Sequence, residues 1–369
     1  IMVIQEMPFG LSELRDNRHT IDAQFREYYT KELRGLVKVS RNHASVIAYS
    51  MSSELDFGRQ TTESFRFFSG DLVREPRKLA PHALVIDCTG YVGALEQTSK
   101  GVRDTDLYVI IIPTWMKEVL DEPEIKTDHQ HPVILHEYNW WSCYPDPADR
   151  EKYAYTQVKP FWLDTLLKSA CANGQEELIP TYRRDSLWLQ ALCRKDGVEY
   201  ARRNPVVEGY ILWLLIDFGQ YCEGLFDDFW NPKNVPAEEF LKSNADTVLL
   251  LAKEGNRCLS TDSTARIPLA VSHYDEEDLN GCTLQWKAKG GPVSVAGEIQ
   301  TPRLEQGKVT NVGDATFQLP QAKSAYKFEL EVALQSGERT VNTNNWSFWA
   351  FPEVGETLIR AVTTGQPAA

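Results

Sequence analysis

Short apolar runs of strand-like length alternate with helical stretches over residues 1–218, and this alternation is the feature that most constrains the fold. The runs end at residues 6, 54, 87, 112, 137 and 217. A run that is apolar nearly throughout is typical of a strand buried on both faces, as in a parallel sheet or barrel. Between the runs, apolar residues recur at helical spacing over 20–38 and again within 149–202. Strands and helices in alternation predict a parallel α/β architecture.

Three of these runs end in a glutamate, and two of them, the runs ending at Glu54 and Glu137, are built alike. Val46–Tyr49 leads through a cluster of serines to Glu54, and Val133–Leu135 leads directly into His136 and Glu137. Catalytic residues of (β/α) barrels lie at the carboxyl ends of the strands, so two such glutamates in one barrel point into the same mouth. Glycoside hydrolysis needs paired carboxylates, because one protonates the leaving oxygen while the other attacks or activates water. The sequence therefore predicts Glu54 and Glu137 as a catalytic pair.

Both segments resemble glycoside hydrolase family 2. The acid/base segment of that family is similar to residues 41–54, Arg-Asn-His-Ala-Ser-Val-Ile-Ala-Tyr-Ser-Met-Ser-Ser-Glu. Its nucleophile segment is similar to residues 132–138, Pro-Val-Ile-Leu-His-Glu-Tyr. The resemblance implies a retaining exo-β-glycosidase with Glu137 as nucleophile and Glu54 as acid/base. It favours a β-galactosidase-like activity, with β-glucuronidase or β-mannosidase specificity as alternatives.

The same resemblance implies a (β/α)8 TIM barrel, in which the acid/base follows strand four and the nucleophile follows strand seven. Counted from Glu54 and Glu137, the first apolar run is strand three and the run ending at Asp217 is strand eight. We therefore expect a barrel domain over residues 1–245 without its first two strands, in a chain that is an N-terminally truncated fragment of a longer protein. The resemblance also implies a periplasmic or extracellular location.

The pattern changes from about residue 246. Segments such as Leu269–Tyr274, Cys282–Lys287 and Tyr326–Leu334 alternate apolar with polar residues, and Gly, Pro or Asn turns separate them. Short alternating strands of this kind are typical of a β-sandwich, and family 2 enzymes carry immunoglobulin-like sandwiches around the barrel. We expect an immunoglobulin-like β-sandwich over residues 246–352, followed by a linker or disordered tail over 353–369.

Further residues near the strand ends are candidate sugar contacts. The resemblance implies that Tyr138, which follows the nucleophile, orients Glu137 through its hydroxyl, with a core tyrosine as the alternative. It also implies that Trp213, the strand-eight tryptophan, forms the floor of the sugar site. Glu6 and Asp217 are weaker candidates, since a strand-end acid is often a solvated loop charge. The remaining candidates are Asp87, Trp115, His136 and Asn139.

Two departures from the family pattern bear on activity. Ser53 stands where the family has an asparagine that hydrogen-bonds the sugar 2-hydroxyl, and Trp115 stands where it has a tyrosine that contacts the nucleophile. These departures leave a catalytically impaired carbohydrate-binding pseudoenzyme as the alternative to an active enzyme. Asn231-Pro-Lys233 matches the Asn-x-Lys signature of β-glucuronidases. It falls where the wider family has an ordinary Pro-Lys exit from strand eight, so we interpret the match as coincidence.

The composition of the chain argues against several classes of binding partner and cofactor. The net charge of −13 and the pI near 5.1 argue against nucleic acid or an anionic membrane as a partner. No stretch approaches the roughly 18 uninterrupted apolar residues of a membrane span. The seven cysteines show no Cys-x-x-Cys spacing, so neither a zinc site nor a redox motif is predicted. We expect a carbohydrate substrate, no cofactor and no catalytic metal, and we allow for a homo-oligomer.

Overall fold

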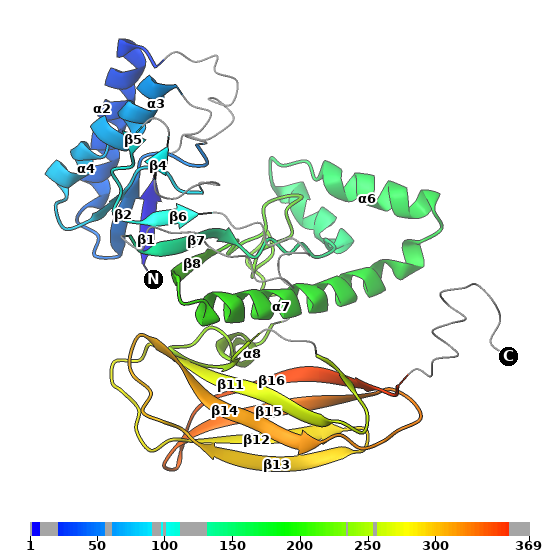
Figure 1. Ribbon diagram of the computed structural model, residues 1–369. Coiled ribbons are helices and arrows are strands. Elements are labelled where there is room, and N and C mark those ends of the chain that lie inside the picture. The colour runs from blue at the N-terminus through cyan, green and yellow to red at the C-terminus, as the bar shows by residue number, and fades with distance from the viewer. Residues whose placement is uncertain are drawn as a thin grey trace, which may run out of the picture. The chain divides into compact units, whose positions relative to one another are not determined.

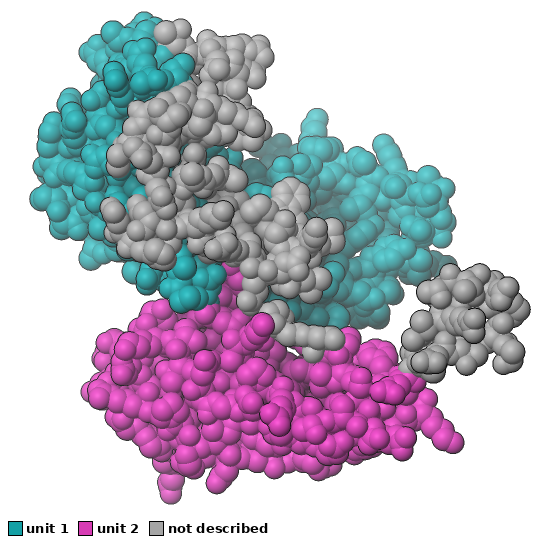
Figure 2. Space-filling model, viewed as in Figure 1, with its two compact units in different colours: residues 1–197, 204–234 teal, residues 198–203, 235–369 magenta. Residues whose placement is uncertain are grey.

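The computed structural model describes residues 2–7, 21–55, 61–90, 97–98, 101–110, 131–233, 235–253 and 257–353. The chain divides into two compact units, which Figure 2 shows in different colours. Unit 1 comprises residues 1–197 and 204–234, and unit 2 comprises residues 198–203 and 235–369. Each unit has a hydrophobic core of its own.

The described part of unit 1 contains six strands that pair in parallel, and each predicted apolar run contributes one of them (Figure 1). They are β1 (Val3–Glu6), β2 (Val46–Ser50), β3 (Leu84–Ile86), β6 (Tyr108–Ile110), β7 (Val133–Tyr138) and β8 (Val207–Leu212). β1, β2 and β3 form one parallel ladder, and β6, β7 and β8 form another. The two ladders meet where the Asp106 amide donates to the Val85 carbonyl at 2.8 Å. These parallel strands therefore follow one another in space in the order of the chain, as crossover connections produce.

Helix α2 (Ala23–Ser40) occupies the crossover between β1 and β2, where the apolar spacing predicts a helix. Its first turn is capped by Asp22, whose side chain accepts a hydrogen bond from the Phe25 amide at 2.8 Å. Its buried side chains, Tyr29, Leu33 and Val37, recur at intervals of four residues and so lie on one face. That face packs into the core of unit 1 beside β2.

The other crossovers are also helical. Between β2 and β3 lie α3 (Thr62–Arg66), the π-turn η1 (Phe67–Asp71) and α4 (Arg74–Leu79). Between β7 and β8 lie η2 (Pro147–Tyr155), α6 (Phe161–Ala172), η3 (Glu176–Leu178) and α7 (Ile179–Arg203). Gly174, with φ of +62°, follows the end of α6, a position where a left-handed residue ends a helix. A short antiparallel hairpin of β4 (Gln97–Thr98) and β5 (Gly101–Val102) follows β3 and was not predicted.

The described part of unit 2 forms two sheets (Figure 1). One has the order β10 (Cys258–Ser260), β16 (Arg339–Phe351), β15 (Tyr326–Ser336), β12 (Thr283–Gly290) and β13 (Val293–Gln300). The other has the order β14 (Lys308–Gln318), β11 (Thr264–His273) and β9 (Thr247–Leu251). All neighbours are antiparallel except β10 and β16. The short helix α8 (Ala237–Leu241) precedes β9.

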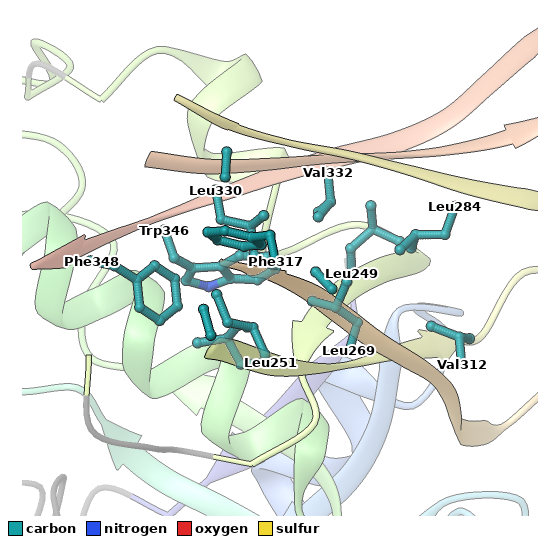
Figure 3. Packing of buried hydrophobic residues seen from close by; sticks show 14 of the residues in the cluster. Leu249, Leu251, Leu269, Leu284, Val312, Phe317, Leu330, Val332, Trp346 and Phe348 are labelled. Atoms are coloured by element: carbon teal, nitrogen blue, oxygen red, sulfur yellow. The ribbon is translucent and has the colours of Figure 1, made fainter. Parts of the chain in front are cut away.

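Both sheets of unit 2 contribute to one apolar core. Figure 3 shows side chains of β11 and β14, such as Leu269 and Phe317, in the same cluster as Leu330 and Trp346 of β15 and β16. The Trp346 indole nitrogen donates to the buried carboxylate of Glu199 at 2.8 Å. A buried indole N–H needs such a partner, because an unpaired polar group in a core is costly.

Candidate active site

Both predicted catalytic glutamates have an unusual backbone conformation. Glu54 has a φ of 51° and Glu137 has a φ of 47°, in the left-handed region that residues with a side chain seldom adopt. The Glu54 amide donates to the Thr89 carbonyl at 2.7 Å, and Ser53 forms a parallel bridge with Thr89. A left-handed conformation costs a residue with a side chain about 1–3 kcal/mol, and residues in this conformation cluster at functional sites. The conformation is thus independent support for a site at the ends of β2 and β7.

The side chains of Glu54 and Glu137 meet in a hydrogen bond. Two carboxyl groups form such a bond only when one of them is protonated, since a carboxylate has no donor. The pKa of Glu137 is raised to about 8, by burial first, then by the negative charge of Glu54 and by this hydrogen bond, and further by the charges of Glu6 and Glu223. Near neutral pH the pair therefore holds one proton, so that one group can donate a proton while the other attacks.

The two residues of this pair have different predicted roles. The roles implied by the sequence resemblance require a proton on Glu54, the acid/base, whereas the raised pKa is that of Glu137. The structure brings the two residues together, and the division of roles between them stays a prediction.

Glu6, at the end of β1, lies beside the pair. Its carboxylate accepts hydrogen bonds from the hydroxyl groups of Thr89 and Ser53. Burial raises the pKa of Glu6, the two hydrogen bonds oppose the rise, and the charge of Glu54 adds to it. Ser53, the residue that departs from the family pattern, is therefore bonded to Glu6. The structure makes Glu6 a stronger candidate than the sequence did.

Glu223 is a carboxylate of the site that the sequence analysis did not single out. It lies in the loop after β8, where its Oε2 accepts from Trp213 Nε1 and its Oε1 accepts from Ser142 Oγ at 2.8 Å. The Trp213 amide donates to the Tyr138 carbonyl at 2.8 Å, which holds this residue next to the end of β7. Apolar periodicity cannot mark a polar loop residue, so only the fold reveals Glu223. The carboxylate cluster is our name for Glu6, Glu54, Glu137 and Glu223.

Asp87, predicted as a sugar contact, is fully buried and fully bonded instead. Arg103 donates to it twice, from Nε to Oδ2 at 2.9 Å and from Nη2 to Oδ1 at 2.5 Å. The Ser69 hydroxyl and the Cys88 amide supply two more hydrogen bonds, at 2.7 and 2.8 Å. Both carboxylate oxygens are therefore used within the protein. Asp87 thus anchors the end of β3, and its complete burial argues against a direct sugar contact.

Tyr138 and Asn139 turn toward helix α7. The Tyr138 hydroxyl, predicted to orient Glu137, donates to the Gly197 carbonyl at 2.8 Å. The Asn139 amide donates to the Arg194 carbonyl at 3.3 Å, and its Oδ1 lies against the Cα of Gly197. Both side chains thus bond backbone carbonyl groups of α7. The alternative of a core tyrosine describes Tyr138 better.

Two further candidates give less information. His136 is 9% exposed, and burial lowers its pKa to about 4, so that its imidazole is neutral at physiological pH. Its Nδ1 has no hydrogen-bond partner among the described residues, and its role as a sugar contact stays a prediction. Trp115 lies outside the described residues.

The Asn231-Pro-Lys233 match is explained by internal contacts. The buried Lys233 ammonium bonds Asp217, and it lies 3.5 Å from the Cys143 sulfur. The Asn231 amide donates to Asp227 at 2.7 Å. Both side chains of the apparent glucuronidase signature thus have partners within the protein. Asp217 is likewise an ion-pair partner and not a free charge at a strand end.

Other kinds of site receive little support in the described part of the chain. There, no group of three or more His, Cys, Asp or Glu side chains is placed to hold a metal ion, and no helix is long and apolar enough to span a membrane. A hollow of about 740 Å³ lies on the five-stranded sheet of unit 2, where Lys242, Lys287, Glu298 and Glu331 are among its lining residues. It contains no predicted site residue, so the carboxylate cluster remains the candidate site.

Comparison of sequences identifies one domain family. Residues 263–352 match the model of a family described as a domain of unknown function, DUF8488. No curated protein matches the chain.

Solved structures share the fold. The β-D-mannosidase of Dictyoglomus thermophilum has a TM-score of 0.60 at 15% identity, and the match covers 94% of this chain and 43% of that one. A variant of the exo-chitosanase of Amycolatopsis orientalis, in complex with PNP-β-D-glucosamine, has a TM-score of 0.56 at 12% identity, over 94% of this chain and 42% of that one. The chain thus spans less than half the length of these proteins. At these identities the similarity shows a mixed α/β fold that is shared with β-glycosidases.

Proposed function

We propose that the carboxylate cluster is the active site of a retaining exo-β-glycosidase of the family 2 type. In this proposal unit 1 forms strands three to eight of a (β/α)8 barrel, and unit 2 is an immunoglobulin-like β-sandwich. The observation that carries the proposal is the hydrogen bond between Glu54 and Glu137, which come from the ends of two parallel strands. Retaining enzymes hold their carboxyl groups about 5–5.5 Å apart and inverting enzymes about 6.5–9.5 Å apart. The short separation of a hydrogen-bonded pair favours a retaining mechanism over an inverting one.

The chemistry proceeds in two displacements. Glu137 attacks the anomeric carbon while Glu54 protonates the leaving oxygen, so that the aglycone leaves and a covalent glycosyl-enzyme forms. Glu54, now ionised, then removes a proton from water, and the resulting attack releases the sugar and regenerates Glu137. The raised pKa of Glu137 supports the proposal in so far as the pair keeps one proton near pH 7, and the first step requires that this proton be on Glu54.

The substrate is proposed to be a terminal β-linked sugar. The sequence resemblance favours a β-galactoside, with β-glucuronide and β-mannoside as alternatives. The similar structures act, by their names, on a β-mannoside and on a β-glucosaminide. The internal pairing of Lys233 and Asn231 removes the one feature of the sequence that favours a glucuronide.

A sugar-binding pseudoenzyme is the second candidate, and Ser53 is the observation that favours it. An asparagine before the acid/base reaches the sugar 2-hydroxyl, where its hydrogen bond strengthens in the transition state. The shorter Ser53 side chain bonds Glu6 instead. Both candidates bind sugar, so turnover is what separates them.

The test is hydrolysis of a panel of aryl β-glycosides with one common leaving group. The chain should be assayed alone and within the longest reading frame that contains it. The glycones should be galactose, glucose, mannose, glucosamine and glucuronate. Turnover of at least one substrate that is lost in Glu137→Gln would support the enzyme. Sugar binding without turnover of any substrate would support the pseudoenzyme.

A further inference from the structure

Hydrogen bonds from three parts of unit 1 hold Glu223 in place. Its carboxylate accepts hydrogen bonds from Trp213, at the end of β8, and from Ser142, in the segment after β7. Its backbone carbonyl accepts a hydrogen bond of 2.5 Å from Nη2 of Arg194, a 3% exposed residue of α7. The same Nη2 donates to the Gly224 carbonyl at 3.3 Å. A loop carboxylate with this many fixed contacts is held in one place, which a merely solvated loop charge would not need.

We propose that Glu223 is a positioning and specificity-determining residue: it fixes the Trp213 ring at the carboxylate cluster and makes the site prefer sugars with a positive charge over sugars with a negative charge. This inference rests on the proposed function and names the charge class of its substrate.

The positioning role follows from the contacts of Trp213. An indole has a single hydrogen-bond donor, and here that donor is taken by the Glu223 carboxylate. The Trp213 amide is held by the Tyr138 carbonyl, so both ends of the residue are fixed beside Glu137. An aromatic face is a suitable platform for a sugar ring, but only if its orientation is fixed. A hydrogen bond to a charged acceptor fixes it more strongly than one to a neutral acceptor.

The charge preference follows from the composition of the cluster. Hydrolysis of a neutral sugar needs two carboxyl groups, and Glu6 and Glu223 are additional. Among the described groups around them, His136 is neutral because burial lowers its pKa to about 4, and Lys233 is paired with Asp217. Arg194 is the cation next to Glu223, and the hydrogen bonds of its Nη2 go to backbone carbonyl groups.

An excess of negative charge in a partly buried site repels a sugar carboxylate and attracts a sugar ammonium group, because interactions in such a site are screened less than in water. This preference needs no direct contact between Glu223 and the charged group. It would act as a penalty against the wrong substrate as much as an attraction to the right one.

The experiment compares three aryl β-glycosides with one leaving group: a glucoside, a glucuronide and a 2-amino-2-deoxyglucoside. Glu223→Gln keeps the size of the side chain and an acceptor for Trp213 but removes the charge. In this variant, kcat/KM for the amino sugar, divided by kcat/KM for the glucoside, should fall about 10-fold. The same ratio for the glucuronide should rise about 10-fold. Ser142→Ala is the matched control, because it removes a partner of the same carboxylate and keeps the charge. Its ratios should equal those of the wild type. Unchanged ratios in Glu223→Gln would overturn the charge role.

Glu223→Ala tests the positioning role, because it removes the acceptor as well as the charge. We expect it to lower kcat/KM for the neutral glucoside clearly more than Glu223→Gln does, and equal losses in the two variants would overturn this role. Calorimetric binding of glucosamine, glucose and glucuronate to Glu137→Gln, with and without Glu223→Gln, separates this inference from the proposed function. If the wild type turned over no substrate, the proposed function would fail. Binding that is tightest for glucosamine, weaker for glucose and weakest for glucuronate would still support the charge role. Affinities in any other order would overturn it.

Discussion

The carboxyl groups of Glu54 and Glu137 are hydrogen-bonded to each other, although their strands, β2 and β7, belong to different ladders of unit 1. The two residues also share the left-handed backbone conformation that places their side chains. Burial first, and then the charge of the nearby Glu54, raise the pKa of Glu137 to about 8. Location, backbone conformation and the raised pKa thus all support the proposal that Glu54 and Glu137 are a catalytic pair.

If the two glutamates have different roles, substitutions of the two residues should affect activity differently. Glu137→Gln should abolish turnover of activated and unactivated substrates alike, because no covalent intermediate can form. Glu54→Ala should reduce turnover of unactivated substrates by roughly 10²–10⁴-fold, the usual worth of a general acid. It should spare glycosylation by substrates with good leaving groups, which need no proton, and added azide should restore turnover. Steady-state kinetics on the two substrate types measure this, and identical behaviour of the two variants would show that the roles are wrong.

Activity should fall as the pH rises through about 8, because the pair then loses the proton that the leaving oxygen requires. The measurement is kcat/KM from pH 5 to pH 10 with an aryl glycoside of poor leaving ability. A substrate whose leaving group needs no proton is the control and should show a weaker alkaline decline. A profile that still rises above pH 9 would contradict the shared proton.

The same raised pKa has a consequence for stability. Between the ordinary glutamate pKa of 4.5 and about 8, the folded protein keeps a proton on Glu137 that the unfolded chain releases. The contribution of this group to the free energy of unfolding is therefore fully present below pH 4.5 and is lost as the pH rises to about 8. Glu137→Gln should be more stable than the wild type at pH 8, with a smaller difference at pH 5. Thermal melting at the two pH values checks this, and a wild type that is more stable than the variant at pH 8 would contradict it.

Asp87 and Arg103 form a buried ion pair with both side chains fully inaccessible. Arg103→Ala should lower the free energy of unfolding by about 3–5 kcal/mol, because it leaves an unpaired buried carboxylate. The exposed pair of Arg150 and Asp164 is the control, and Arg150→Ala should change the free energy of unfolding far less than Arg103→Ala does, because an exposed ion pair is screened by water. Urea denaturation measures both. Equal effects of the two substitutions would show that Asp87 is not held as the structure indicates.

Gly197 on α7 is required by its contact with Asn139. A Cβ at this position would lie 1.9 Å from Asn139 Oδ1, so Gly197→Ala should displace Asn139 and the neighbouring Glu137 and lower activity. Gly35 on α2 has nothing within 4 Å of such a Cβ. Gly35→Ala should therefore stabilise the protein by about 0.5–1 kcal/mol, as alanine usually does in a helix. A Gly197→Ala variant with full activity would contradict the packing of Asn139.

The sequence alone predicts the parallel strands and the two glutamates at their ends, because buried strands have continuous apolar runs and the site lies where such runs stop. It does not predict which way each neighbouring side chain points. Asp87, Tyr138 and Asn139 lie in the predicted segments, yet their partners, Arg103 and α7, are far along the chain. Glu223 belongs to a loop, whose position only the tertiary fold determines.

The most direct test of the central claim is to identify the residue that carries the covalent intermediate. A 2-deoxy-2-fluoro glycoside of a sugar that the protein hydrolyses, with a good aryl leaving group, should trap the glycosyl-enzyme. The fluorine slows both steps by destabilising their oxocarbenium-like transition states, whereas the leaving group speeds only the formation of the intermediate, which therefore accumulates. Mass spectrometry of proteolytic peptides should then find one sugar on Glu137 in the wild type and none in Glu137→Gln. A label on Glu54, or turnover with inversion at the anomeric carbon and no label at all, would contradict the account.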